Sequence, residues 1–198
     1  MPRWQHFDTS GPLLPSLRRI TTLAAFIYVP LALLAVVWAT IGQGRDVWSL
    51  ANPWLEAPYG TRLGISLALG IALGILVVRS TPFVLARFAW AQALHAELAP
   101  LVRDLSSTQV TWLAVLSGVG EELFFRGAMQ PVFGLWLTSL IFGALHVGPR
   151  RVFLAWGAWA FVMGVLLGAL FALTGLVWGS IFAHVWINQR NFRFIQRG

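Results

Sequence analysis

The amino-acid sequence predicts an all-α, polytopic integral membrane protein, a bundle of about six transmembrane helices with one interfacial amphipathic helix. Of its 198 residues, 58% are hydrophobic and only 11% are charged, whereas about a quarter of the residues in a soluble domain are charged. The mean hydropathy is +0.73, and several apolar stretches approach the roughly 20 residues that span a bilayer. The length suits one domain, so we expect residues 1–198 to form a single membrane domain.

The residue types present restrict the possible chemistry. Cysteine is absent, which excludes a disulfide framework, a thiol nucleophile and Cys-ligated metal sites. Chemistry must therefore come from Glu, His, Ser or Asn. The net charge of +7 arises from 14 Arg and no Lys. In a chain this apolar, excess Arg indicates the cytoplasmic face of a lipid bilayer and not a nucleic-acid partner.

The first half of the chain predicts two spans and one amphipathic helix. Residues 20–41 form an apolar run without a small-residue cleavage site, so we expect a retained span and not a signal peptide. Residues 63–78 form the second span, in which Gly70 and Gly74 offer a face that another helix can approach closely. Residues 82–104 mix charged and aromatic side chains, which is typical of an interfacial amphipathic helix.

The second half of the chain predicts four more spans, over residues 108–129, 135–147, 152–174 and 176–188. Pro131 is expected to end the first of these. Gly148 and Pro149 supply a helix stop after the second, and Gly175 turns the chain between the third and the fourth.

The Arg residues are distributed unevenly between the two ends of these spans. If the N-terminus lies inside, only Arg45 and Arg62 fall on the outer side, and Arg126 lies within a span. The other eleven fall on the cytoplasmic side: Arg3, Arg18, Arg19, Arg79, Arg87, Arg103, Arg150, Arg151, Arg190, Arg193 and Arg197. This asymmetry follows the positive-inside rule and predicts that both termini are cytoplasmic.

Ionisable side chains inside the predicted spans are unusual, because each costs about 2.5 to 3.5 kcal/mol at a helix centre. Five are present, with an amide at the end of the last span: Glu121, Glu122, Arg126, His146, His184 and Asn188. At ~1.5 Å per residue from the outer turns, the two glutamates, the two histidines and Asn188 lie roughly 14 to 20 Å deep. Three helices are therefore predicted to bring polar groups to one layer near the midplane.

Helical spacing predicts which of these side chains face one another. Glu122 and Arg126 lie four residues apart, the spacing of an intrahelical ion pair. Glu121 is rotated about 100° away, which leaves it as the free carboxylate and a candidate general base or acid. His146 follows Phe142 by one turn, and Asn188 follows His184 by one turn, so each pair shares a helix face.

These residues resemble the motifs of the CAAX-protease and bacteriocin-processing (CPBP, or Abi) family of intramembrane proteases. The motif EExxxR matches Glu121, Glu122 and Arg126, FxxxH matches Phe142 and His146, and HxxxN matches His184 and Asn188. The resemblance covers roughly residues 105–190, the expected catalytic core. Residues 1–104 would then supply accessory spans and the cytoplasmic amphipathic segment.

The resemblance implies a glutamic-type endopeptidase that hydrolyses a peptide bond in a membrane-associated protein or peptide. Glu121 and His146 would activate a water, and His184 with Asn188 would donate hydrogen bonds to the tetrahedral oxyanion, a role that suits His and Asn donors.

The resemblance also implies supporting roles and leaves the cofactor open. Glu122 and Arg126 would orient the first helix of the core, and Phe142 would pack. We expect no cofactor. Members of the family are also described as metalloproteases, and a three-ligand zinc site of Glu121, His146 and His184 with an open position is the alternative.

The motifs do not choose among the substrates of similar enzymes, which include prenylated CAAX tails, maturing peptides and C-terminal sorting helices. The Lys-free composition suggests a GC-rich bacterial genome, where prenylated substrates are less expected. We therefore expect a C-terminal sorting or anchor tail as substrate and the bacterial inner membrane as location.

Other interpretations make different demands on the sequence. Ser117, Ser139 and Ser180 are intramembrane hydroxyls, but no GxSG-like segment supports a serine nucleophile. The chain lacks HExxH and has no Asp in any predicted span, against zincin-type and aspartyl sites. Buried Glu and His also carry protons in transporters, and a non-catalytic membrane chaperone or immunity protein could retain the same fold.

Overall fold

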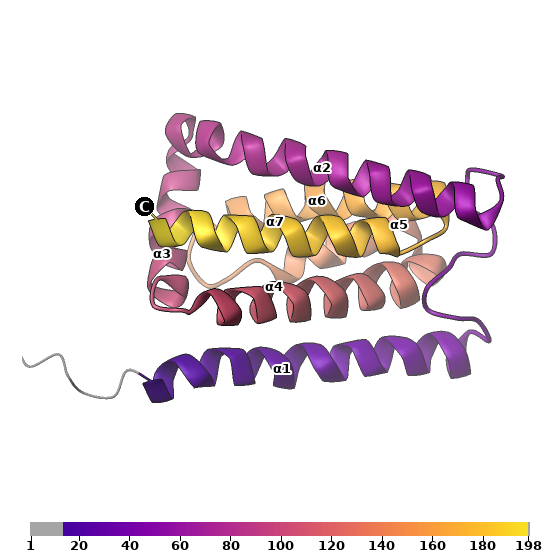
Figure 1. Cartoon of the computed structure of the whole chain (residues 1–198), viewed down its shortest axis with the longest axis horizontal. Coiled ribbons are helices and arrows are strands. Elements are labelled where there is room, and N and C mark those ends of the chain that lie inside the picture. Colours follow the sequence, from indigo (N-terminus) through magenta and orange to yellow (C-terminus); the bar gives the residue numbers. More distant parts are fainter. Residues whose placement is uncertain (1–13, 198) are drawn as a thin grey trace, which may run out of the picture.

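A computed structural model describes residues 14–197 as a bundle of long helices with one short helix lying across its end (Figure 1). The helices are α1 (Leu14–Val37), α2 (Tyr59–Arg87), α3 (Ala89–Val102), α4 (Ser107–Glu122), α5 (Gln130–Leu145), α6 (Val152–Thr174) and α7 (Trp178–Arg197). Two π-helical segments extend α1 and α4, namely η1 (Trp38–Gly42) and η2 (Leu123–Met129). The predicted all-α membrane bundle is confirmed.

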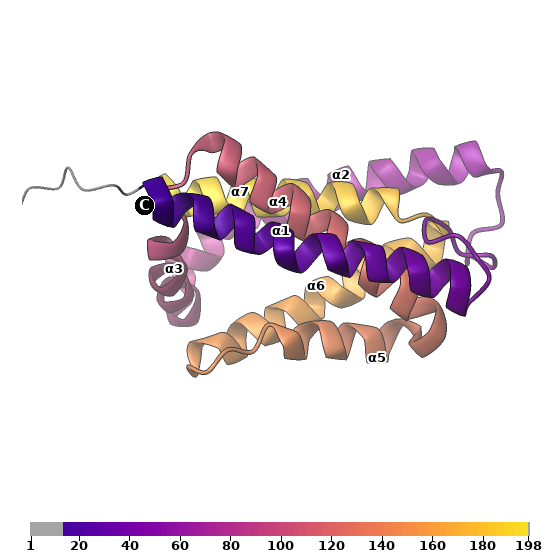
Figure 2. The same ribbon diagram turned by 90° about the horizontal axis from the view of Figure 1, so that it is seen from below.

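Four helical stretches are long and apolar enough to cross a membrane: Ile20–Gly42, Tyr59–Arg87, Ser107–Leu145 and Val152–Thr174. The third stretch contains two antiparallel legs, α4 with η2 and then α5, which run in opposite directions in Figure 2. The chain reverses at Gly134, whose φ of 75° and ψ of 172° are not helical. A positive φ suits glycine because it has no Cβ.

The predicted helix end at Pro131 is therefore wrong by a few residues. The backbone stays helical from η2 through Gln130 into Pro131, and the Gly127 carbonyl, which the missing Pro131 N–H would otherwise reach, accepts from the Arg45 guanidinium. The reversal occurs at Gly134 instead.

The predicted start of the amphipathic helix at Pro82 is also wrong, because α2 continues through this proline to Arg87. Just before it, the hydroxyls of Ser80 and Thr81 donate to the Val77 carbonyl at 2.9 and 3.0 Å. Such side-chain hydroxyls help to satisfy backbone groups around a proline in an apolar setting. The chain leaves the helix at Phe88, which is extended, and α3 then crosses the end of the bundle (Figures 1 and 2).

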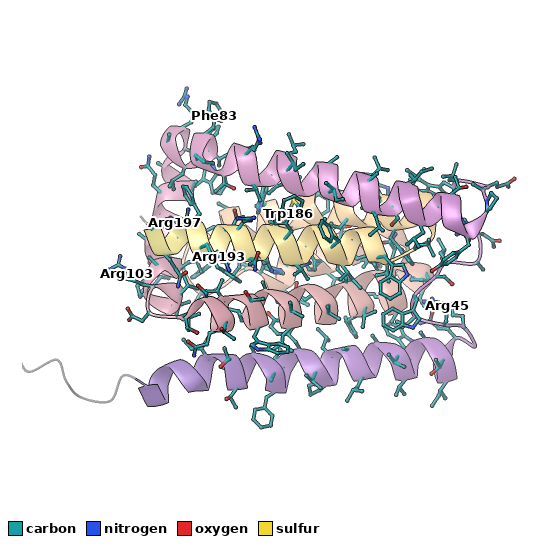
Figure 3. All side chains as sticks on the ribbon, viewed as in Figure 1. Arg45, Phe83, Arg103, Trp186, Arg193 and Arg197 are labelled. Atoms are coloured by element: carbon teal, nitrogen blue, oxygen red, sulfur yellow. The ribbon has the colours of Figure 1, made fainter. Side chains whose placement is uncertain are left out.

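The small-residue face of α2 packs on α7, as its glycine spacing predicts. A Cβ at Gly70 would lie only 2.3 Å from the Gly179 carbonyl oxygen, and a Cβ at Gly179 only 2.0 Å from that of Ser66. The Ser66 hydroxyl accepts from the Gly179 N–H at 3.1 Å and donates to the Leu176 carbonyl at 3.3 Å. Further along, Trp186 packs over Gly74 at 3.3 Å from the position of a Cβ, between the two helices in Figure 3.

The segment between α1 and α2 closes the end of the bundle opposite α3. Gln43 Nε2 donates to the Ala128 carbonyl at 2.9 Å, and the Arg45 guanidinium donates to the Gly127 carbonyl. Both acceptors belong to η2, so the polar segment supplies donors to the π-helical turn. The backbone N–H of Leu50 donates to the Gly175 carbonyl at 2.8 Å, which ties the same segment to the turn between α6 and α7.

The basic side chains divide between the two ends of the bundle, as the sequence predicts. Arg103, Arg193 and Arg197 lie at the end crossed by α3, and Arg45 lies at the opposite end (Figure 3). Arg3 lies outside the described residues. The chain is an integral membrane protein, and the cytoplasmic position of the α3 end stays a prediction.

We expect Gly70→Ala to destabilise the bundle by about 1 to 3 kcal/mol, the usual result of overpacking, because the new methyl group would collide with the α7 backbone. Gly64→Ala is the matched control on the same helix, since a Cβ there has no atom within 4 Å. Thermal unfolding of the purified proteins in detergent measures both. Equal midpoints for the two variants would contradict the close α2–α7 contact.

Candidate active site

Side chains from three helices meet in one layer of the bundle. Glu121 and Glu122 end α4, His146 caps the C-terminus of α5, and His184 lies on α7. The Nε2 atoms of His146 and His184 lie 4.0 and 3.8 Å from Glu121 Oε2. The predicted convergence of these groups is therefore present in the structure.

Glu122 is the most deeply buried carboxylate of the site, with 0% of its side chain exposed. Its Oε1 accepts from Arg126 Nη1 at 2.9 Å and from His184 Nδ1 at 2.7 Å. The i,i+4 pair with Arg126 has the geometry that the spacing predicts. The contact with His184 joins α4 to α7, and it does not follow from the spacing of either motif.

Arg126 connects this carboxylate to two more helices. Its Nη2 donates to the Gly164 carbonyl of α6 at 3.2 Å, and its Cζ lies 4.6 Å from the centre of the Phe142 ring on α5. Cation–π contacts of this kind are stronger away from water. Phe142 is thus more than a packing residue, because it covers the guanidinium.

A hydrogen bond of His146 sets which ring nitrogen carries the proton when the imidazole is neutral. Nδ1 lies 2.7 Å from the Phe142 carbonyl oxygen, which can only accept, so Nδ1 carries the proton. Nε2 then presents its lone pair toward Glu121. A neutral imidazole held in this way is suited to accept a proton or to bind a metal.

Glu121 is buried, but its Oε2 has no hydrogen-bond partner. Both imidazole nitrogens facing it are too distant for a direct hydrogen bond. Separations of 3.8 and 4.0 Å are those at which a bridging water should be considered. The arrangement can therefore hold one small polar group between a carboxylate and two imidazoles.

Asn188 lies one turn beyond His184 on α7, and both side chains line the same cavity as Glu121. Its Nδ2 donates to Ser117 Oγ on α4 at 3.0 Å. An amide nitrogen carries two hydrogens, so one remains for a ligand. Asn188 therefore lies near the predicted site, and its role in oxyanion binding stays a prediction.

The site opens into a large, mostly apolar cavity of about 930 Å³. Helix α3 contributes Trp90, Leu94 and Leu98 to the wall, and α6 contributes Trp156 and Met163. The cavity therefore extends from the carboxylates toward the end of the bundle crossed by α3. Its size and its apolar lining suit a segment of a hydrophobic peptide.

The alternative zinc site does not fit this arrangement. Ligand atoms around a tetrahedral zinc at its usual bond lengths lie about 3.3 Å apart, closer than the 3.8 and 4.0 Å found here. Across residues 14–197, no group of three His, Cys, Asp or Glu is placed to hold a metal ion. The expectation that the protein uses no metal cofactor stays a prediction.

The three serines weighed as nucleophiles donate to backbone carbonyls of their own or neighbouring helices. Ser180 Oγ donates to Leu167 O at 2.9 Å, Ser139 Oγ to Leu135 O at 2.7 Å, and Ser117 Oγ to Leu113 O at 2.9 Å. A serine nucleophile instead requires a hydroxyl hydrogen-bonded to a base. The hydroxyls therefore have structural roles in this conformation.

Tyr28 on α1 is a site residue that the motif analysis missed. It packs against Gly120, the residue directly before Glu121, and Tyr28 and Glu121 both line the cavity. The sequence does offer one sign of it: Tyr28 is one of only 2 Tyr in the chain, and it brings a hydroxyl group into an apolar span.

Comparison with known proteins identifies the part of the chain that carries the site. Residues 104–189 match the family model of the Rce1-like type II CAAX prenyl endopeptidases. The uncharacterized protein YpbD of Bacillus subtilis (strain 168) is 35% identical over 99 residues, which cover 46% of this chain and 51% of YpbD. The chain thus spans about half the length of this curated relative, and no solved structure matches it.

The matched segment contains all seven residues of the three motifs, from Glu121 to Asn188. The resemblance that these motifs indicate is therefore confirmed, and residues 104–189 are similar to the Rce1-like type II CAAX prenyl endopeptidases.

Proposed function

We propose that the protein is an intramembrane endopeptidase in which Glu121 and His146 activate a water and His184 with Asn188 binds the oxyanion. The observation that carries the proposal is the unpartnered Oε2 of buried Glu121, which faces Nε2 of both histidines. A carboxylate and a neutral imidazole around one water can remove its proton as it attacks a carbonyl. The match to a protease family supports the same chemistry.

The oxyanion would form on the α7 side of this water. Asn188 retains one amide hydrogen after its bond to Ser117. His184 donates from Nδ1 to Glu122, so a donation from Nε2 to the oxyanion requires the doubly protonated imidazole. Two adjacent carboxylates offer the negative charge that such an imidazolium needs. Donors fixed in this way stabilise the charge that develops in the transition state.

Glu122 and Arg126 would act as positioning residues. Glu122 holds the His184 ring through Nδ1, and Arg126 holds the carboxylate and contacts α6. This assignment refines the expectation that the pair only orients its own helix, because the carboxylate also sets the direction of an imidazole on α7.

The substrate class follows from the cavity and from the charge distribution. The apolar cavity that reaches from Glu121 to α3 suits a hydrophobic peptide that enters from the α3 end. The Arg residues gathered there favour the cytoplasmic face for this end, by the positive-inside rule. We therefore propose a membrane-anchored substrate, such as a protein with a C-terminal sorting or anchor tail, and a location in the bacterial inner membrane.

Glu121→Gln should abolish cleavage, with a loss of about 10²- to 10⁴-fold, the usual contribution of a general base. Mass spectrometry of membrane-protein termini, in cells with wild-type or variant protein, should reveal a tail that only the variant leaves uncleaved. Glu56→Gln, in the exposed segment before α2, is the control and should behave as wild type. Identical termini in all strains would contradict protease function, and loss of ion movement instead would favour a proton relay.

Glu122→Gln should lower stability by about 3 to 5 kcal/mol, because it leaves a buried guanidinium without its counter-charge. A double variant, Glu122→Gln with Arg126→Met, should regain most of this stability, since it removes both charges. It should remain inactive, because an amide in place of the carboxylate holds His184 more weakly. Thermal unfolding and cleavage rate separate the two effects, and full activity in the double variant would contradict the positioning role.

Metal dependence is tested directly on the purified protein. We expect cleavage to continue in the presence of 1,10-phenanthroline and elemental analysis to find far less than one zinc per chain. Stoichiometric zinc that is lost in both Glu121→Gln and His146→Ala would instead establish the three-ligand metal site.

A further inference from the structure

We infer that Tyr28 of α1 is a positioning residue that holds the Glu121 carboxylate toward the two histidines. The inference rests on the proposed function, in which Glu121 acts on the water. It also assigns a role to a helix that lies outside the segment shared with the protease family, residues 104–189.

Helix α1 approaches the catalytic helix at one glycine. A Cβ on Gly120 would lie 2.9 Å from the carbonyl oxygen of Tyr28 and 3.0 Å from its Cβ. Any larger residue before Glu121 would push the two helices apart. The missing side chain therefore allows the α1 backbone to touch α4 one residue before the catalytic carboxylate.

Tyr28 lies on the inward face of α1. Ala24 and Ala35 are 6% and 0% exposed, and their spacing of four and seven residues from Tyr28 places all three on one side of the helix. Phe26 and Ile27, on the other side, are 75% and 53% exposed. The phenol thus extends into the bundle and not into the lipid.

Tyr28 and Glu121 line the same cavity, and Tyr28 packs against Gly120, the residue directly before Glu121, so the phenol hydroxyl is placed to donate to the Glu121 carboxylate. Within residues 14–197, Glu121 has no other hydrogen-bond donor: its Oε2 is unpartnered, and both imidazole nitrogens are beyond hydrogen-bonding distance. A carboxylate held by one donor has fewer rotamers to sample. Since a phenol O–H donates a single hydrogen, Tyr28 can fix the group and leave an oxygen for the water.

The hydrogen bond can be tested on purified protein without a substrate. Infrared difference spectra between wild type and Tyr28→Phe should show a shift of a carboxyl band, because the substitution removes only the hydroxyl. The same difference in a Glu121→Gln background should retain the tyrosine bands and lose the carboxyl shift. A spectrum without any Glu121-dependent carboxyl shift would overturn the inference.

The effect of Tyr28 on catalysis can be measured with the substrate tail that mass spectrometry of membrane-protein termini identifies. Tyr28→Phe should lower kcat about tenfold or more, as expected for the loss of a hydrogen bond to a charged group, with KM within about twofold of wild type. Tyr59→Phe is the control, because this exposed tyrosine at the start of α2 lies outside the cavity lining. A raised KM with unchanged kcat would mean that Tyr28 binds substrate, and would overturn the positioning role.

A second variant disturbs the contact between α1 and α4 at Gly120 and leaves the Tyr28 side chain unchanged. Gly120→Ala should displace Tyr28 and lower kcat, whereas Gly64→Ala, with no atom near its Cβ, should not. Adding Gly120→Ala to Tyr28→Phe should produce little further loss, since both act on one contact. Additive losses would overturn the inference. If the Glu121→Gln variant cleaves normally, the proposed function is wrong. If Glu121→Gln is inactive but Tyr28→Phe is fully active, only the Tyr28 inference is wrong.

Discussion

The polar centre of this membrane protein depends on one buried carboxylate, that of Glu122. A single oxygen of this group accepts hydrogen bonds from Arg126 and His184, at 2.9 and 2.7 Å. A buried charge without partners is strongly destabilising, so the three groups must be present together. Through Arg126 the same cluster reaches the Gly164 carbonyl and the Phe142 ring. Four helices are thereby joined at one point.

This arrangement explains how two adjacent glutamates can have different roles. Glu122 is committed to structure because both its partners are cations or potential cations. Glu121 instead lines the cavity, and its Oε2 lies 3.8 and 4.0 Å from the Nε2 atoms of His184 and His146 without a direct hydrogen bond. The close helix contacts at Gly70, Gly120 and Gly179 bring the backbones near enough for such short side chains to meet. The polar side chains can therefore meet because glycines allow the helices to pack closely.

The errors in the expected helix boundaries have a common physical origin. Both involve proline, which disfavours a helix only where its missing N–H is needed. The Gly127 carbonyl, four residues before Pro131, accepts from Arg45 instead, and Pro82 follows two hydroxyls that donate to the Val77 carbonyl. The actual reversal at Gly134 depends on a positive φ, which a sequence with 19 glycines does not reveal by composition.

The sequence by itself determined the membrane class, the succession of helices and the seven motif residues that meet at the candidate site. Those features depend on composition and on spacing within one helix, where residues four apart must share a face. Only the tertiary structure decided that His184 bonds to Glu122, that α1 brings Tyr28 to Glu121, and that a cavity connects the site to α3. These contacts join residues far apart in the chain, and they depend on how close and at what rotation whole helices pack.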